Sequence, residues 1–271
     1  MNATNSPAAS GNPAEAPLDT AAALRAAEHA VREAGRVLLD LAHRPLEVVA
    51  EAAHDIKLRA DQLAEACILE VLAADFPLPV LTEESGEHGA LTETSRMWVV
   101  DPLDGTFNYF RGMPMCCTSV GLWDNGEPVL GAVYDFFGGH FFLGAAGLGA
   151  TLNGEPVRPS GVTVPEKAAL ATGFPHHRDL GDASMAQFLA QVRQYKKIRM
   201  LGSAALMGAY VSNGWLDAYV EDDIWLWDIA AAAAIARAAG ATVEVGPGTA
   251  GRWARTIVCA ATPELAAALR P

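Results

Sequence analysis

The chain has 271 residues, of which 51% are hydrophobic and 19% are charged, a composition typical of a globular protein. Its 32 acidic and 19 basic residues give a formal charge of −13, which argues against sequence-independent binding of nucleic acid and against docking on anionic lipid. A phosphorylated substrate remains compatible with this charge if bound divalent cations neutralise the phosphate. The apolar run that starts at Ile229 is interrupted by Arg237 and is too short to span a bilayer, so we expect no membrane segment.

The first 18 residues are rich in Ala, Asn, Ser and Pro and are expected to form a disordered tail. They lack the basic and apolar regions of a signal peptide. The four cysteines have no C-x-x-C spacing, so we expect reduced thiols and a cytoplasmic protein. These cysteines are Cys67, Cys116, Cys117 and Cys259.

The elements expected between residues 19 and 160 mix helices with antiparallel strands. Apolar residues at helical spacing predict a helix over Asp19–His43, and a second over Leu63–Phe76 that Pro77 ends. The polar segment Leu81–Gly89 is expected to be a loop. Strands are predicted at Met97–Val100, Thr118–Trp123, Val129–Phe136 and His140–Leu143.

From about residue 161 to 271 the pattern changes to alternating strands and helices. We therefore predict an α/β chain with an α+β N-terminal half and an α/β C-terminal half, divided near residue 160. Gly246–Gly251 fits G-x-G-x-x-G, but a strand follows it, which favours a hairpin turn over a dinucleotide site. The predicted strands are Leu170–Gly173, Ile198–Leu201, Ala218–Val220, Thr242–Val245 and Thr256–Ala260, and the predicted helices are Ser203–Gly214, Ile229–Ala239 and Pro263–Leu269.

The segment Asp101-Pro102-Leu103-Asp104-Gly105-Thr106 carries the densest chemical signal. A strand ends there in two carboxylates, and hard cations such as Mg²⁺ prefer oxygen ligands. Gly105 permits close backbone approach, and Thr106 offers a hydroxyl and an N–H at a possible helix start. The alternative is an ordinary β-turn. A covalent aspartyl-phosphate mechanism of the haloacid dehalogenase type is excluded, because Pro102 occupies the position of the nucleophile.

Two further acidic segments flank this turn in the sequence. Glu83-Glu84-Ser85 precedes the strand that leads to Asp101, although paired glutamates in a loop are usually solvated. Asp228 opens an Ala-rich helix, where a helix N-cap would explain it. A carboxylate at the rim of an apolar core is nevertheless costly unless it is paired or bound to a metal.

Taken in order, these segments resemble the inositol monophosphatase family over roughly residues 20–265. The resemblance implies a layered αβαβα sandwich of the inositol monophosphatase / fructose-1,6-bisphosphatase type, a phosphatase activity and a homodimer. The segments that carry it are Lys57–Gln62, Glu83–Ser85, Asp101–Tyr109, Gly147–Gly154, Gly202–Ala205, Gly214–Tyr219 and Trp227–Ala232.

The resemblance also implies a role for each site residue. One Mg²⁺ would be bound by Glu83, Asp101 and the Leu103 carbonyl, a second by Asp101, Asp104 and Asp228, and a third would lie near Asp61. The implied catalytic residues are Glu83, Asp104 and Thr106, with Gly105 and Thr106 donating to the phosphate. Gly202, Ser203, Ala204 and Glu221 would line the alcohol side of the substrate pocket.

The expected function is Mg²⁺-dependent hydrolysis of a small phosphate monoester by metal-activated water, with myo-inositol 1-phosphate as the favoured substrate and two or three ions bound. Hydrolysis of histidinol phosphate is the alternative within the superfamily. Arg111–Pro114 resembles that branch, and the acidic run Glu221–Asp223 could attract a cationic substrate. A metal-binding interaction protein without catalytic activity is the alternative of a different class.

Overall fold

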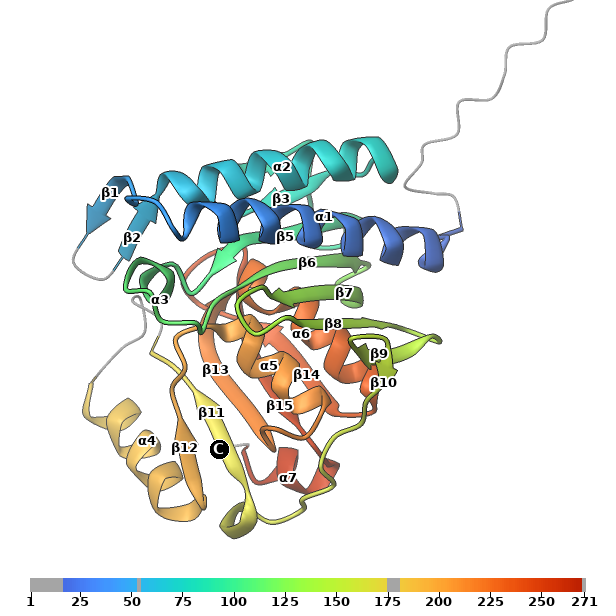
Figure 1. Cartoon of the computed structure of the whole chain (residues 1–271). Helices are drawn as coiled ribbons and strands as arrows, with labels where there is room; N and C mark the ends of the chain where they lie inside the picture. The colour runs from blue at the N-terminus through green and yellow to red at the C-terminus, as the bar shows by residue number, and fades with distance from the viewer. Residues whose placement is uncertain (1–16, 53–54, 175–180, 270–271) are drawn as a thin grey trace, which may run out of the picture.

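The computed structural model describes residues 17–52, 55–174 and 181–269, which form five layers of helices and sheets (Figure 1). From one side to the other, the layers are a helix pair, a large sheet, a second helix pair, a smaller sheet and an outer helical layer. This order agrees with the predicted αβαβα sandwich. Most of the predicted tail, residues 1–16, lies outside the described residues.

The first sheet has eight strands in the order β10-β9-β8-β7-β6-β5-β3-β4, antiparallel except for the pair β3–β5. Helices α1 (Thr20–Leu41) and α2 (Arg59–Asp75) cover its outer face, and the hairpin of β1 (Val48–Ala52) and β2 (Asp55–Leu58) lies between them in the chain. The strands are β3 (Val80–Thr82), β4 (Gly86–His88), β5 (Met97–Asp104), β6 (Cys117–Asp124), β7 (Glu127–Asp135), β8 (His140–Ala145), β9 (Gly149–Leu152) and β10 (Glu155–Pro156). The short helix α3 (Thr106–Phe110) follows β5.

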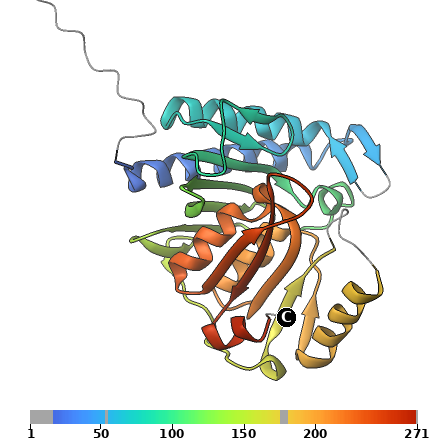
Figure 2. The same ribbon diagram turned by 180° about the vertical axis from the view of Figure 1, so that it is seen from behind.

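The second sheet has five strands in the order β12-β11-β13-β15-β14, with parallel pairing only around β11. Its strands are β11 (Ala169–Thr172), β12 (Lys197–Arg199), β13 (Ala218–Trp225), β14 (Thr242–Pro247) and β15 (Ala254–Ala260). Helices α5 (Ala204–Ser212) and α6 (Leu226–Ala239) fill the space between the sheets, while α4 (Asp182–Gln194), α7 (Pro263–Ala267) and the 3₁₀ turn Pro165–Lys167 lie outside (Figure 2). Among the described helices, none combines the length and hydropathy needed to cross a membrane.

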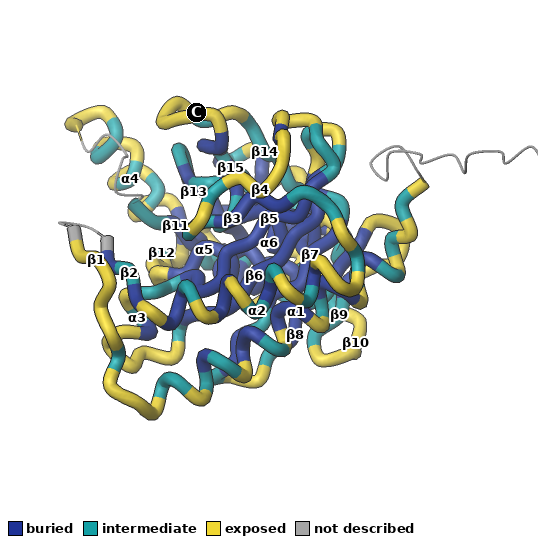
Figure 3. The backbone as a smooth tube through the Cα atoms, turned by 90° about the horizontal axis from the view of Figure 1, so that it is seen from above, coloured by how far each residue is buried: buried dark blue, intermediate teal, exposed yellow. Residues whose placement is uncertain are grey.

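The chain passes from the first sheet to the second between β10 and β11. Helix α6 contacts strands of both sheets, so the two halves share one central apolar layer, which is dark blue at the centre of Figure 3. The division into units 19–160 and 161–271 therefore stays a prediction.

Three glycines of the first sheet allow α6 to approach closely. Gly121, Gly131 and Gly144 are cross-strand neighbours on β6, β7 and β8. A Cβ on Gly131 would lie 2.6 Å from the Ala231 Cα, and one on Gly144 would lie 2.7 Å from the Ile235 Cα. Side chains at these positions would therefore push α6, and the residues at its start, away from the sheet.

Several local predictions differ from the structure. The predicted loop Leu81–Gly89 is wrong in part, because it contains β3 and β4, and β3 is fixed by parallel pairing to β5. Helix α2 begins four residues before the predicted Leu63, where the Asp61 carboxylate accepts a 2.7 Å hydrogen bond from the Leu58 N–H. The sequence analysis also missed β1, β2 and α4, and α4 has no buried residue whose periodicity would reveal it.

We predict that Gly131→Ala lowers the free energy of unfolding by about 2–3 kcal/mol, or roughly 5–10 °C in melting temperature, because the added methyl overlaps the α6 backbone. Thermal unfolding measured by circular dichroism checks this. Gly251→Ala is the matched control, since its Cβ would meet only the Trp225 ring at 3.6 Å. Equal melting temperatures for the two variants would contradict the close approach.

Candidate active site

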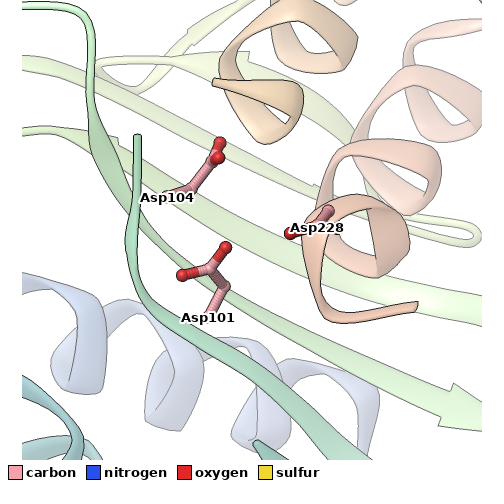
Figure 4. A group of neighbouring side chains, drawn as sticks. All are labelled: Asp101, Asp104 and Asp228. Atoms are coloured by element: carbon pink, nitrogen blue, oxygen red, sulfur yellow. The ribbon is translucent and has the colours of Figure 1, made fainter. Parts of the chain in front are cut away.

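Three aspartates converge where β5 meets the first turn of α6. Asp101 and Asp104 lie on β5, and Asp228 is the third residue of α6 (Figure 4). One carboxylate oxygen from each lies within 4.8 Å of the others. Asp101 is 1% exposed and Asp104 is 7% exposed. Hard oxygen donors grouped in this way are the ligands that Mg²⁺ prefers, so the donor set fits the expected cation.

The electrostatics of the group are unfavourable without a cation. Burial raises the pKa values of Asp101 and Asp228 well above their usual range, and the charges of the neighbouring carboxylates raise them further. The pKa of Asp104 is raised less strongly, since burial is opposed by hydrogen bonds from Ser203 and from two backbone amides. A divalent cation would favour the ionised form of all three.

Glu83 follows directly after β3, and its N–H donates to the Val100 carbonyl of β5 at 3.2 Å. Its carboxyl group shares a hydrogen bond with Asp101, and burial followed by the Asp228 charge raises its pKa. The structure therefore places Glu83 beside the aspartates but outside the tight group of three. Glu84 forms an ion pair with Lys57 at 3.2 Å, and its charge also raises the pKa values of Glu83 and Asp61.

A buried glutamate that the sequence analysis missed shapes the segment around Glu83. Glu65 of α2 is 7% exposed and accepts hydrogen bonds from the Thr82 hydroxyl at 2.7 Å and from the Ser85 N–H and hydroxyl, both at 3.0 Å. These contacts hold the ends of the turn that carries Glu83. Glu65 lies four residues after Asp61 on the same face of α2, and this spacing could have identified Glu65 from the sequence.

Asp61, Thr106 and Leu103 meet near the end of β5. The Thr106 hydroxyl lies 3.0 Å from the Asp61 carboxylate and 2.9 Å from the Leu103 carbonyl, and its single proton can be donated to one of them at a time. Burial raises the pKa of Asp61 to about 6, although hydrogen bonds from Leu58 and Thr106 act in the opposite direction. Thr106 is thus held at a fixed position at the start of α3.

Asp104 joins the two halves of the chain. Its carboxylate accepts hydrogen bonds from the Ser203 hydroxyl at 2.5 Å, the Ala205 N–H at 2.7 Å and the Ala204 N–H at 3.2 Å. These donors form the N-terminus of α5, where the helix dipole favours negative charge. Ser203 and Ala204, predicted to line the substrate pocket, contact Asp104 in the structure.

The loops that carry Gly105 and Gly202 touch each other. Gly105 has a φ of 88°, and a Cβ there would lie 3.1 Å from the Gly202 carbonyl and 2.8 Å from the Met115 carbonyl. The Asn108 amide of α3 donates to the Met115 carbonyl at 2.7 Å and to the Leu201 carbonyl at 2.8 Å. Asn108, which sequence reasoning did not single out, therefore ties the acidic turn to the loop before α5.

A pocket of about 440 Å³ opens beside the aspartates. Glu221, 4% exposed, is part of its wall, together with Gly202, Ser203 and Ala204, so the structure brings these four residues together. The pocket is lined by Asp104, Thr172, Gly173, Phe174, Met200, Gly202, Ser203, Ala204, Met207, Glu221, Ile224 and Asp228.

Of the acidic run Glu221–Asp223, only Glu221 is among the residues that line this pocket. The Asp223 carboxylate accepts hydrogen bonds from the Thr249 hydroxyl at 2.7 Å and the Ala250 N–H at 3.1 Å, so it holds the turn between β14 and β15. Asp228 is also not the predicted N-cap, because α6 begins at Leu226 and the Asp228 carboxylate accepts from the Trp225 N–H at 3.1 Å.

Comparison with known proteins places these features in a family. The model of the inositol monophosphatase family matches residues 19–270. Nus factor SuhB from Xylella fastidiosa is 38% identical over 218 residues, covering 79% of this chain and 78% of that protein. Inositol-1-monophosphatase from Synechocystis is 36% identical over 235 residues, covering 86% and 82%. The solved inositol monophosphatase from Anabaena (Nostoc) matches with a TM-score of 0.80 at 34% identity, covering 93% and 95% of the two chains.

We predict that the metal-free protein loses stability as pH rises from about 4 to 8. The raised pKa values mean that the folded state holds protons that the unfolded state releases, so the unfolding free energy falls over this range. Asp101→Asn removes one of the repelling charges and should raise the melting temperature in EDTA at pH 8 by at least about 3 °C.

The same substitution should reduce the stabilisation that Mg²⁺ gives, because a ligand is lost. Thermal unfolding in EDTA and in Mg²⁺, at pH 5 and pH 8, measures both effects. Asp182→Asn, on the exposed first turn of α4, is the control and should change neither. A metal-free protein that is more stable at pH 8 than at pH 5 would contradict the prediction.

Proposed function

The chain belongs to the inositol monophosphatase family and is therefore a phosphoric monoester hydrolase, and we propose that its reaction is the Mg²⁺-dependent hydrolysis of myo-inositol 1-phosphate or a closely related polyol phosphate. The observation that carries this proposal is the pairing of the Asp101–Asp104–Asp228 group with the pocket that Glu221 lines. The first offers ligands for cations that neutralise a phosphate. The second offers hydrogen-bond acceptors for the alcohol.

In this proposal the ions are held by Asp101, Asp104, Asp228, Glu83 and the Leu103 carbonyl. When bound, they supply an activated water and stabilise charge on the phosphate and on the leaving oxygen. With Asp61, 3.0 Å away, as its partner, the Thr106 hydroxyl is positioned to orient that water. Burial raises the pKa of Asp61 to about 6, so its carboxylate is ionised at neutral pH and can accept the Thr106 hydrogen bond or adjoin a third ion. The N–H groups of Gly105 and Thr106 donate to the phosphate.

The pocket favours a polyol over a cationic alcohol. Of the three acidic residues Glu221–Asp223, only Glu221 lines the pocket, and Asp223 is occupied by the 249–250 turn. The buried Glu221 carboxylate, in the same pocket as Gly202 and Ser203, is suited to accepting hydrogen bonds from neighbouring hydroxyls. Phe174 and Met200 supply an apolar wall, against which the imidazole of histidinol phosphate would also fit, so this substrate belongs in the test.

We also propose a cytoplasmic homodimer. The exposed Phe107, Phe110 and Met113 around α3 support self-association, because large apolar side chains are 61%, 37% and 45% exposed there. The relatives named Nus factor SuhB make a non-catalytic interaction role the competing proposal. Against it, a buried group of carboxylates costs folding stability that an interaction surface does not require.

We predict phosphate release from myo-inositol 1-phosphate in Mg²⁺ and none in EDTA. Asp228→Asn should lower kcat/KM at least about a hundredfold, because a cation ligand is lost while the amide oxygen can still accept from Trp225. The measurement is colorimetric phosphate release from myo-inositol 1-phosphate, histidinol phosphate and a nucleoside 3′,5′-bisphosphate.

Each result has a definite meaning. A preference for myo-inositol 1-phosphate supports the proposal, whereas a preference for histidinol phosphate moves the protein to the other branch. Release from none of the three, by protein that Mg²⁺ stabilises, would overturn the substrate assignment and favour the interaction role. Glu221→Gln should raise KM for the polyol phosphate more than it raises KM for p-nitrophenyl phosphate, because p-nitrophenyl phosphate has no hydroxyl for Glu221 to bind.

A further inference from the structure

Ser119 of β6 has a buried hydroxyl group whose hydrogen-bonding capacity is unused. The residue is 1% exposed, and its Oγ has no hydrogen-bond partner among the residues that the structure describes. Buried hydroxyl groups in folded proteins are nearly always paired, so an orphan of this kind calls for an explanation such as an ion or water in its vicinity.

The side chain of Ser119 faces the layer of α6. Its neighbour Thr118 faces the opposite side, because the Thr118 hydroxyl donates to the Val31 carbonyl of α1 at 3.1 Å. Gly121, two residues after Ser119 and on the same face, lies against α6, where a Cβ would be 2.8 Å from the Ala231 nitrogen. Ser119 is therefore the next residue along this face of β6 from the contact with α6.

The register between strands brings Ser119 to the aspartate group. Ser119 lies directly opposite Asp101 on β5, and on its other side it lies opposite Val133 of β7. Directly opposed residues of an antiparallel pair have Cβ atoms about 4.5–5.5 Å apart on one face of the sheet. The polar side chain opposite Ser119 on the neighbouring strand is therefore the carboxylate of Asp101. Asp101 belongs to the group of three aspartates that also contains Asp228.

We propose that Ser119 is a positioning residue of the metal centre, whose hydroxyl donates its hydrogen bond to an oxygen of the cation's ligand shell, either the Asp101 carboxylate or a water on the ion. The proposal rests on the proposed function, because it needs a cation bound at Asp101. It accounts for a buried hydroxyl that apolar Val133 cannot satisfy. Groups that hold metal ligands in this way fix the orientation of the ligand and raise the affinity for the ion.

The test compares Ser119→Ala with Thr118→Val. Both remove one buried hydroxyl from adjacent residues of β6, but only Ser119 faces the aspartates. The readout is the Mg²⁺ concentration that gives half of the maximal rise in melting temperature, supported by Mn²⁺ titration followed by electron paramagnetic resonance. Neither measurement depends on catalysis.

We expect Ser119→Ala to raise the half-maximal Mg²⁺ concentration about tenfold. Its melting temperature in EDTA should equal or exceed that of the unsubstituted protein, because an unpaired hydroxyl is removed. Thr118→Val should do the reverse, with a lower melting temperature in EDTA and a half-maximal Mg²⁺ concentration within about twofold of the unsubstituted protein. In phosphate-release assays, Ser119→Ala should need more Mg²⁺ while keeping kcat at saturation.

The outcomes separate this inference from the proposed function. If Mg²⁺ stabilises the unsubstituted protein and Ser119→Ala leaves the half-maximal concentration unchanged, the inference is overturned and the proposed function stands. If Mg²⁺ has no effect on the unsubstituted protein, both are overturned. Ser119→Cys, which keeps a weak donor of similar size, should give an intermediate concentration and serves as the second variant if the alanine protein does not fold.

Discussion

The close contact between α6 and the first sheet is the constraint on which the site depends. Gly121, Gly131 and Gly144 have no side chains that would separate the helix from the sheet, and Gly208 allows α5 to approach the Ala232 methyl of α6. The helix is thus fixed along its length, and its first turn carries Asp228 to Asp101. An Ala-rich helix is required here for a packing reason, since larger side chains would not fit between two sheets at this spacing.

This geometry works against the stability of the protein and in favour of its chemistry. Bringing Asp101, Asp104 and Asp228 together in a buried position raises their pKa values, which is the electrostatic cost of the arrangement. The N-terminus of α5 offsets part of that cost through three hydrogen bonds to Asp104. Asp101 and Asp228 have less compensation, so the energy gained on binding a cation is largest where the ligands are least satisfied.

Apolar periodicity predicted most of the long elements, such as α1 and β6, whereas the layered arrangement was implied by the resemblance to the inositol monophosphatase family. The order of the acidic segments also predicted Asp101, Asp104 and Asp228, which the structure brings together. What could not be predicted depends on contacts distant in the sequence. Strand β3 exists through parallel pairing with β5, and Glu65 matters through its hydrogen bonds to Thr82 and Ser85. The unsatisfied hydroxyl of Ser119 becomes visible only once the register with Asp101 is known.

The two sides of the site come from different parts of the chain, and this division has a consequence for specificity. Glu83, Asp101 and Thr106 lie on the first sheet and the segments next to it, whereas Phe174, Met200 and Glu221 lie on the second sheet and its loops. The two parts meet at the Asp104–Ser203 hydrogen bond and at the Gly105–Gly202 contact. Substitutions in the pocket wall can therefore change the alcohol that is accepted while the carboxylates that hold the cation stay in place.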